Sequence, residues 1–300
     1  DTFTVVLDEQ PSSDVVFSVS TGDSGEATVS PTTLTFTSGN WNSAQTVTVT
    51  GVNDDLIDGS QTTTITLSVV DAISDDDFDS LADKTVSVST ADNDTASFTV
   101  AQSSGSTAVS ESGSTDTFTV VLGAQPASNV VISVTSGDTG EATVSPATLT
   151  FTSGNWNSAQ TVTVAGVNDS LVDGTQTSTL TLSVVDGSSD NNFDPVADQT
   201  VSAATTDNDT AGFTVVQSGG STSVAETGST DTFTVVLDAQ PTSDVVISVT
   251  SGDTGEATVS TGTLTFTSGN WNSAQTVTVT GVDDSLVDGS QTTAATISVV

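Results

Sequence analysis

The chain contains no cysteine and no histidine, and only one of its 300 residues, Lys84, carries a basic side chain. Without cysteine there are no disulfides, so stability must come from hydrophobic cores, bound metal or neighbouring modules. Without clustered lysine and arginine, the phosphate contacts of a nucleic-acid-binding protein are excluded, and so is docking on an anionic membrane surface. Zinc, copper and iron sites are disfavoured because histidine and cysteine, their usual ligands, are missing.

Long apolar runs are also absent. No stretch approaches the roughly 18 apolar residues that a membrane-spanning helix needs. The chain opens within a strand pattern, so we expect no signal peptide at its start. Serine and threonine are plentiful, but no histidine or cysteine is present to activate them as nucleophiles. Paired carboxylates can cleave glycosides, but their repetition along the chain favours a scaffold, and we expect no enzymatic activity.

What the chain has in abundance is negative charge, with 38 aspartate and glutamate residues and a formal net charge of -37. Acidic sequences with few aromatic residues are often disordered. Here, strict alternation of apolar and polar residues and a high content of valine, threonine, phenylalanine and isoleucine predict β-strands instead. Folding so much like charge together is opposed by self-repulsion, which a divalent cation would reduce.

Internal repetition dominates the sequence. The segment Asp-Thr-Phe-Thr-Val-Val-Leu begins at Asp1, Asp116 and Asp231, a period of 115 residues. Residues 116–185 and 231–300 are identical at 58 of 70 positions. Such a fixed period is the signature of a repeat architecture. We therefore expect a window on a longer array, divided into residues 1–95 (a module lacking its first strand), 96–210 (a complete module) and 211–300 (a module lacking its last strand).

Within the complete module, short alternating segments are separated by turn residues. Clear examples are Phe118, Val120 and Leu122 on one face of a strand, and Val162 and Val164 on one face of another. About seven such strands in roughly 100 residues, with turn signals every 8–12 residues, predict an all-β fold of antiparallel β-sandwiches. No segment has a helical period, and strand exchange between neighbouring modules is disfavoured because neither end has a spare strand.

Acidic residues recur at four places in the repeat: a Ser-Glu or Ala-Glu pair, a Gly-Glu-Ala-Thr-Val-Ser segment, an acidic turn, and a closing Asp-Asn-Asp-Thr. We define the acidic turn as residues 53–59, 168–174 and 283–289. Loops of a sandwich gather at its two ends, so all four sets can meet at one end. Six to eight hard oxygen ligands are what Ca²⁺ requires. The alternative is that aspartate, asparagine and glycine simply form turns, but glutamate does not. The candidate metal ligands are Glu26, Asp54, Asp55, Asp58, Asp92, Asp94, Glu111, Glu141, Asp169, Asp173, Asp207, Asp209, Glu226, Glu256, Asp283, Asp284 and Asp288.

Taken in order, these segments resemble the Calx-beta domain of sodium–calcium exchangers, an integrin β subunit and many bacterial surface proteins. The resemblance covers the whole chain and rests on the sets above together with Gly262-Thr263-Leu264-Thr265-Phe266. It implies an immunoglobulin-like sandwich holding Ca²⁺ at the end that faces the next module. Carried over by position, the ligands are Glu111, Glu141, Asp169, Asp173, Asp207 and Asp209. The sequence departs from the exchanger domains at Ser170, Gly174 and Asn208, where those domains are more acidic, which implies fewer ions or weaker binding.

Two further features have simpler explanations. Residues 75–79 and 190–194 place acidic or amide side chains at alternate positions, but they lack the glycine and distant glutamate of an EF-hand. We interpret them as solvated acidic loops. Trp41, Trp156 and Trp271 resemble sugar-stacking platforms, yet a repeated indole covering a sandwich edge is more common.

Two functional hypotheses follow. The favoured one is a calcium-binding structural array of a large secreted or cell-surface bacterial protein, acting as an adhesin stalk or an extracellular filament. Its partners would be adjacent modules of the same array and, in a fibre, identical chains. The alternative is a calcium-sensing or ligand-binding module attached to an enzyme or transporter elsewhere in the chain. Near-identical repeats favour the array, because sensing modules usually diverge from one another.

Overall fold

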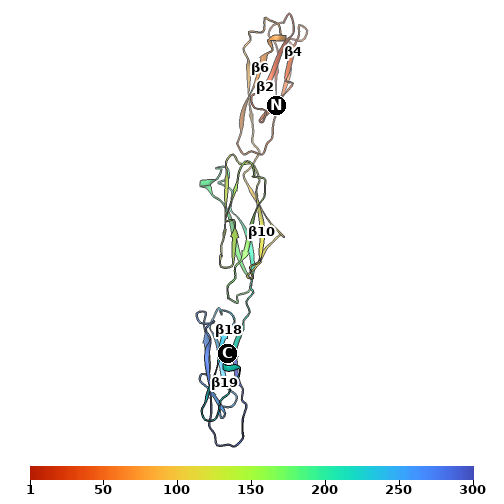
Figure 1. Cartoon of the computed structure of the whole chain (residues 1–300). Coiled ribbons are helices and arrows are strands. Elements are labelled where there is room, and N and C mark those ends of the chain that lie inside the picture. The colour runs from red at the N-terminus through yellow and green to blue at the C-terminus, as the bar shows by residue number, and fades with distance from the viewer.

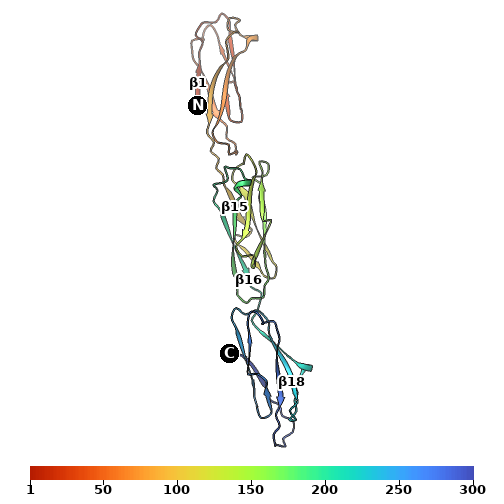
Figure 2. The ribbon, with the colours of Figure 1, turned by 90° about the vertical axis from the view of Figure 1, so that its left-hand side faces the viewer.

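The computed structural model describes all 300 residues and shows three β-sandwich modules arranged end to end (Figures 1 and 2). Each module has its own cluster of buried apolar side chains, which extends over residues 7–67, 57–203 and 233–279 in turn. The only helical elements are three turns of 3-10 helix, three residues each. No helix is long and apolar enough to cross a membrane.

The 23 strands are short, as expected from the frequent turn residues. In the first module they are β1 (Thr2–Val5), β2 (Val15–Thr21), β3 (Ala27–Ser30), β4 (Thr33–Phe36), β5 (Gln45–Gly51), β6 (Gln61–Val69) and β7 (Lys84–Thr90). In the second they are β8 (Phe98–Gln102), β9 (Thr107–Ser110), β10 (Thr115–Leu122), β11 (Val130–Ser136), β12 (Ala142–Ser145), β13 (Thr148–Phe151), β14 (Gln160–Gly166), β15 (Gln176–Val184) and β16 (Gln199–Thr206). In the third they are β17 (Phe213–Gln217), β18 (Thr230–Leu237), β19 (Val245–Ser251), β20 (Ala257–Val259), β21 (Thr263–Phe266), β22 (Gln275–Gly281) and β23 (Ala295–Val299).

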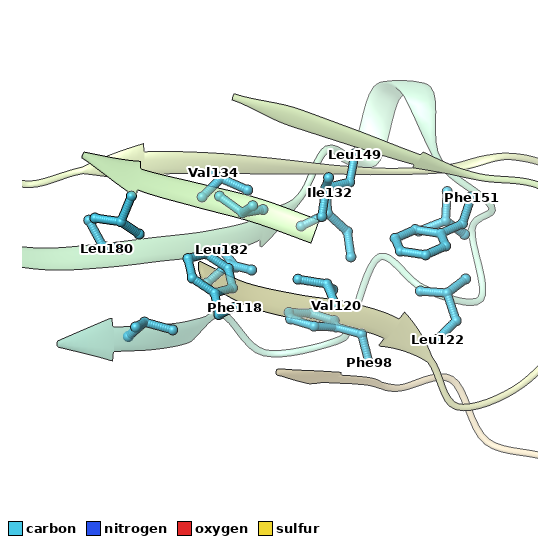
Figure 3. Close-up of a cluster of buried hydrophobic side chains, with 14 of the residues drawn as sticks. Phe98, Phe118, Val120, Leu122, Ile132, Val134, Leu149, Phe151, Leu180 and Leu182 are labelled. Carbon is cyan, nitrogen blue, oxygen red and sulfur yellow. The ribbon is translucent and has the colours of Figure 1, made fainter. Parts of the chain in front are cut away.

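The second module shows the architecture most fully. Its two sheets have the strand orders β12-β14-β10-β8 and β13-β11-β15-β16-β9. Alternate residues of each strand face inward, so Phe118 and Val120 from one sheet meet Ile132 and Leu182 from the other (Figure 3). All four side chains are fully buried. The alternation predicted from the sequence is therefore confirmed, and the sandwich results from burying the apolar face of each sheet.

The strand count and pairing differ in two ways from the sequence expectation. The second module contains nine strands rather than about seven, and the short segment β9 pairs as a strand of its own. One pair is parallel, β9 with β16, in the register Ala203↔Thr107 to Thr206↔Ser110. All other ladders between strands are antiparallel, as predicted. Because parallel neighbours end at the same edge of a sheet, this pair places the residues after both strands side by side.

The first and third modules repeat the same plan with fewer strands. Strand orders β4-β2-β6-β7 and β1-β5-β3 correspond to β13-β11-β15-β16 and β10-β14-β12. In the third module β17-β18-β22-β20 corresponds to β8-β10-β14-β12. The third module has no counterpart of β16, and the segment equivalent to β9 forms no strand there.

Deleting part of the two-sheet core should destabilise only the module that contains it. Leu182 is fully buried, so Leu182→Ala is expected to lower the free energy of unfolding of the second module by about 2–5 kcal/mol. Thr161, an exposed residue of the same module, supplies a control in which Thr161→Ala changes stability far less. Urea unfolding would be followed by the fluorescence of Trp156 in a Trp41→Phe, Trp271→Phe background. Equal losses from both substitutions would contradict this assignment of the core.

Candidate metal centre

Four segments meet at the end of the second module that faces the third. Glu111 follows β9, Glu141 precedes β12, the acidic turn 168–174 joins β14 to β15, and residues 207–209 follow β16. The parallel register extends to hold Glu111, whose backbone N–H donates to the Thr206 carbonyl at 3.1 Å. The Glu141 carbonyl accepts hydrogen bonds from Val167 N–H at 2.9 Å and from the Thr205 hydroxyl at 3.2 Å. Backbone pairing therefore fixes where the carboxylates lie.

These carboxylates form two overlapping groups. Glu111, Asp169 and Asp209 each offer an oxygen within 4.8 Å of the others, and so do Glu111, Glu141 and Asp173. Glu111 belongs to both groups. Five of the six ligands implied by the family resemblance are thereby brought together, and Glu111 is placed to bridge two cation positions.

Burial makes this arrangement unfavourable for a metal-free protein. Glu111 is only 2% exposed and Glu141 only 8%. Glu141 Oε2, Asp173 Oδ1 and Asp209 Oδ2 are buried and have no hydrogen-bond partner. Buried carboxylate oxygens are normally paired or coordinate a metal, because removing a charge from water without a partner is costly. The three unpartnered oxygens are divided between the two groups, Asp209 in one and Glu141 with Asp173 in the other, and they indicate a place for a cation in each group.

Asp207 has a different position in the site. Its Oδ1 accepts from Asp209 N–H at 2.6 Å, and its Oδ2 accepts from Gly174 N–H at 2.8 Å and Asp173 N–H at 3.1 Å. These bonds lower the pKa of Asp207. Asp207 thus joins the closing segment to the acidic turn and orients Asp173 and Asp209; its direct ligation of a metal stays a prediction.

The pKa values of the two buried glutamates shift the other way. Burial is the largest cause that raises the pKa of Glu111; the charges of Asp169, Asp207 and Asp173 add to it, and the Asn208 N–H acts against it. Burial also raises the pKa of Glu141, followed by the charges of Asp173, Asp169 and Glu111. A carboxyl group of raised pKa is one whose charged form lacks stabilisation. A divalent cation would provide it.

The first module repeats the arrangement in part. Glu26, Asp54, Asp58, Asp92 and Asp94 line one small surface cavity. Asp92 accepts from Asp94, Gly59 and Asp58 N–H groups just as Asp207 does, and its pKa is likewise lowered. Burial raises the pKa of Glu26 and of Asp94.

In the third module the predicted residues assemble less completely. Glu256, Asp284 and Asp288 form a group within 4.8 Å, and burial is the largest cause that raises the pKa of Glu256. Glu226 is exposed, because no parallel strand fixes the segment before it. Asp283 is also exposed.

Asp55 belongs to neither the cavity nor a group; its backbone carbonyl instead accepts from Gln125 N–H of the second module at 2.7 Å. The ligand roles predicted for Asp55, Glu226 and Asp283 stay predictions.

The sequence interpretation missed the residues beside Asp55. Leu56 and Ile57, an apolar pair inside an acidic turn, lie at the boundary between modules, and that unusual pairing is the signal that marks them.

The interpretation of residues 75–79 and 190–194 as solvated loops is wrong for their first residue. Asp75 is 4% exposed and Asp190 6%. Asp75 Oδ2 accepts from the Ser12 N–H, the Ser12 hydroxyl and the Ser13 N–H, at 2.7–2.9 Å. Backbone and hydroxyl hydrogen bonds lower the pKa of Asp75 to about 2. These aspartates organise the loops at the opposite end of the first and second modules.

The three tryptophans are half-buried and each packs against the core of its own module. The carbonyl of Trp156 also accepts from Leu122 N–H at 3.1 Å. The structure therefore bears out the interpretation of a repeated indole that covers the sandwich.

Comparison with known proteins leaves the family unassigned. No family model matches the chain, and no curated protein matches it. Among solved structures, domains 4–9 of the S-layer protein SbsC are 17% identical, cover 94% of this chain and 38% of that one, and have a TM-score of 0.31. Domains 4 and 5 of the same protein are 20% identical over 63% of this chain and 70% of that one, with a TM-score of 0.30. CBD12 from CALX1.2 is 15% identical over 63% of this chain and 76% of that one, with a TM-score of 0.26. These scores are too low to assign a function.

The opposite pKa shifts predict an unusual pH dependence for the metal-free protein. Because the pKa values of Glu111 and Glu141 are raised, their contribution to stability is fully present below the ordinary glutamate value of 4.5 and is lost as pH rises through the folded-state pKa. In chelator, the melting temperature of the second module should therefore rise as pH falls from 7 toward 4.5. The lowered pKa of Asp207 gives a contribution present above the ordinary value of 3.8, so stability should fall again below that pH.

Thermal unfolding followed by Trp156 fluorescence between pH 3 and pH 8 would measure this profile. The double variant Glu111→Gln, Glu141→Gln should flatten the part between pH 4.5 and pH 7 while keeping the fall at lower pH. An unchanged profile in the double variant would show that these two glutamates do not cause it.

Proposed function

We propose that the chain is a calcium-binding structural array in which carboxylates at the end of each module hold Ca²⁺. The observation that carries the proposal is the set of three buried, unpartnered carboxylate oxygens of Glu141, Asp173 and Asp209 around the shared Glu111. The only basic side chain of the protein, Lys84, is exposed and belongs to the first module. No protein cation is available to neutralise this centre, so a bound ion is the remaining partner.

The donor set favours calcium over other metals. The grouped donors are all carboxylate oxygens, the hard ligands that Ca²⁺ and Mg²⁺ take. The carboxylates come from four separate segments, which suits the six to eight ligands and irregular geometry of Ca²⁺ better than the strict octahedron of Mg²⁺. The departures from the Calx-beta pattern at Ser170, Gly174 and Asn208 remove acidic donors and favour weaker binding, in the range of about 10⁻⁴–10⁻³ M that is typical of extracellular modules.

The position of the centre supports a mechanical role. The modules follow one another in a line (Figures 1 and 2), and the first two acidic turns lie where one module meets the next. An ion there would reduce the repulsion between carboxylates and restrict the motion of the loops that form the boundary. We propose an extracellular or bacterial cell-surface stalk or filament with no catalytic role, whose partners are neighbouring modules of the same kind. The Calx-beta relationship is part of the proposal.

Calcium binding can be tested by isothermal titration calorimetry of the chelator-treated full chain. We expect Ca²⁺ binding with weaker or no response to Mg²⁺, and saturation at about 100 times the dissociation constant should add roughly 2.7 kcal/mol of stability per site. Glu111→Gln should remove binding at the second module, because Glu111 belongs to both groups there.

Asp198→Asn is the matched control, since it removes one negative charge from an exposed residue of the same module that belongs to neither group. Equal melting temperatures in chelator, Ca²⁺ and Mg²⁺ would show that the carboxylates form plain turns. Electron microscopy separates the two sequence-based hypotheses, because an array predicts rods in Ca²⁺ whereas independent sensing modules predict separated globules.

A further inference from the structure

The apolar tip of the first acidic turn lies in the core of the following module. Ile57 is 8% exposed, and the hydrophobic cluster that contains it is that of the second module, with Ala124 and Phe193. Ala124 is 2% exposed and Phe193 is fully buried. The side chain of a residue in one module thus completes the hydrophobic core of another.

Backbone hydrogen bonds hold this tip in place. Gln125 N–H donates to the Asp55 carbonyl at 2.7 Å, and Ile57 N–H donates to the Gln125 carbonyl at 3.1 Å. Together they form a short parallel bridge between Leu56 and Gln125. The Asn192 side-chain amide adds a donor to the Ile57 carbonyl at 3.1 Å. Backbone hydrogen bonds therefore fix both the direction and the register in which the tip meets the next module.

The second boundary repeats the parallel bridge, although not every part of the first contact. Leu171 pairs with Gln240 in a parallel bridge, and Gln240 N–H donates to the Ser170 carbonyl at 2.7 Å. Ala239, the equivalent of Ala124, is 6% exposed. Val172, the equivalent of Ile57, is half-buried. It does not belong to the apolar cluster of the third module, so at this boundary the tip contacts the next module without entering its core.

The third acidic turn shows what the tip looks like without a neighbour. Val287, the equivalent of Ile57, is 105% exposed and Leu286 is 67% exposed. The turn itself is formed nonetheless, since Asp284 Oδ1 accepts from Leu286 N–H at 2.8 Å, as Asp54 does from Leu56 at 3.0 Å. The tip is therefore shaped within its own module but buried only by the next one.

We propose that the tip of each acidic turn is a docking element, and that the partner it fits is the Ala-Gln loop of a following module of the same kind. Both internal boundaries have the parallel bridge, and the first also buries Ile57 in the next core. The exposed Leu286–Val287 pair is the same element without its partner. The apolar contact does not require a metal. It couples adjacent modules directly, so that part of the stability of each module depends on its neighbour, as in other linear repeat proteins.

The test substitutes aspartate at equivalent positions of two copies in the full chain. Ile57→Asp buries a charge in the second core, whereas Val287→Asp makes the same substitution where no module covers it. Both variants would be studied in chelator, so the result does not depend on whether the carboxylates bind an ion. The melting temperature of the second module would be read from Trp156 as the only tryptophan.

Motion at the joint would be measured by electron paramagnetic resonance between spin labels at Thr28→Cys and Thr143→Cys, exposed positions in the first two modules. The chain has no other cysteine, so these labels are unique. Ile57→Asp is expected to lower the melting temperature of the second module by about 5 °C or more and to broaden the distance distribution. Val287→Asp is expected to change neither.

The milder pair Ile57→Ala and Val287→Ala keeps the test valid if Ile57→Asp does not fold. Ile57→Ala is expected to lower the melting temperature of the second module by a smaller amount, and Val287→Ala to leave it unchanged. If either readout for the Ile57 variants matches that of the Val287 variants, the proposal is overturned. Calcium titration of the same proteins separates this result from the proposed function, because a lost joint with intact calcium binding supports the docking element alone.

Discussion

The repulsion between carboxylates held together at one end of each module is the constraint on which the rest of the structure depends. Glu111 and Glu141 are buried beside Asp169, Asp173 and Asp209, and no lysine or arginine is near them. The surrounding scaffold is rigid enough to hold them there, because each segment is fixed by strand pairing or by backbone hydrogen bonds. Such an arrangement persists only if the folded β-sandwich compensates for its electrostatic cost, or if a cation removes it.

The same acidic turn has two physical roles that use different atoms. Its carboxylates point to the centre shared with Glu111, while its backbone and the apolar pair at its tip contact the next module. Asp169 illustrates the connection, because its Oδ1 accepts from Leu171 N–H at 2.6 Å while the residue also belongs to a carboxylate group. The carboxylates and the boundary contacts of the turn are thus joined by one short loop.

Differences between the three copies reveal which contacts organise the site. Where β9 pairs with β16, Glu111 is buried; in the third module, without that pair, Glu226 is exposed. The acidic turn keeps its local hydrogen bond in all three copies. Local sequence therefore shapes the acidic turn, whereas the position of Glu111 depends on the pairing of β9 with β16.

The sequence by itself determined the repeat, the β-sandwich, the inward face of each strand and most of the acidic set. Successive side chains of a strand point to opposite faces, so the alternation of apolar and polar residues indicates which side chains are buried. The 115-residue repeat indicates that the same fold recurs in each module. Only the tertiary structure decided that β9 runs parallel to β16, that Asp207 and Asp75 accept backbone hydrogen bonds, and that Ile57 belongs to the core of its neighbour. Each of these depends on segments distant in the chain, and the alternation of residues within a strand carries no information about which strand, or which module, lies beside it.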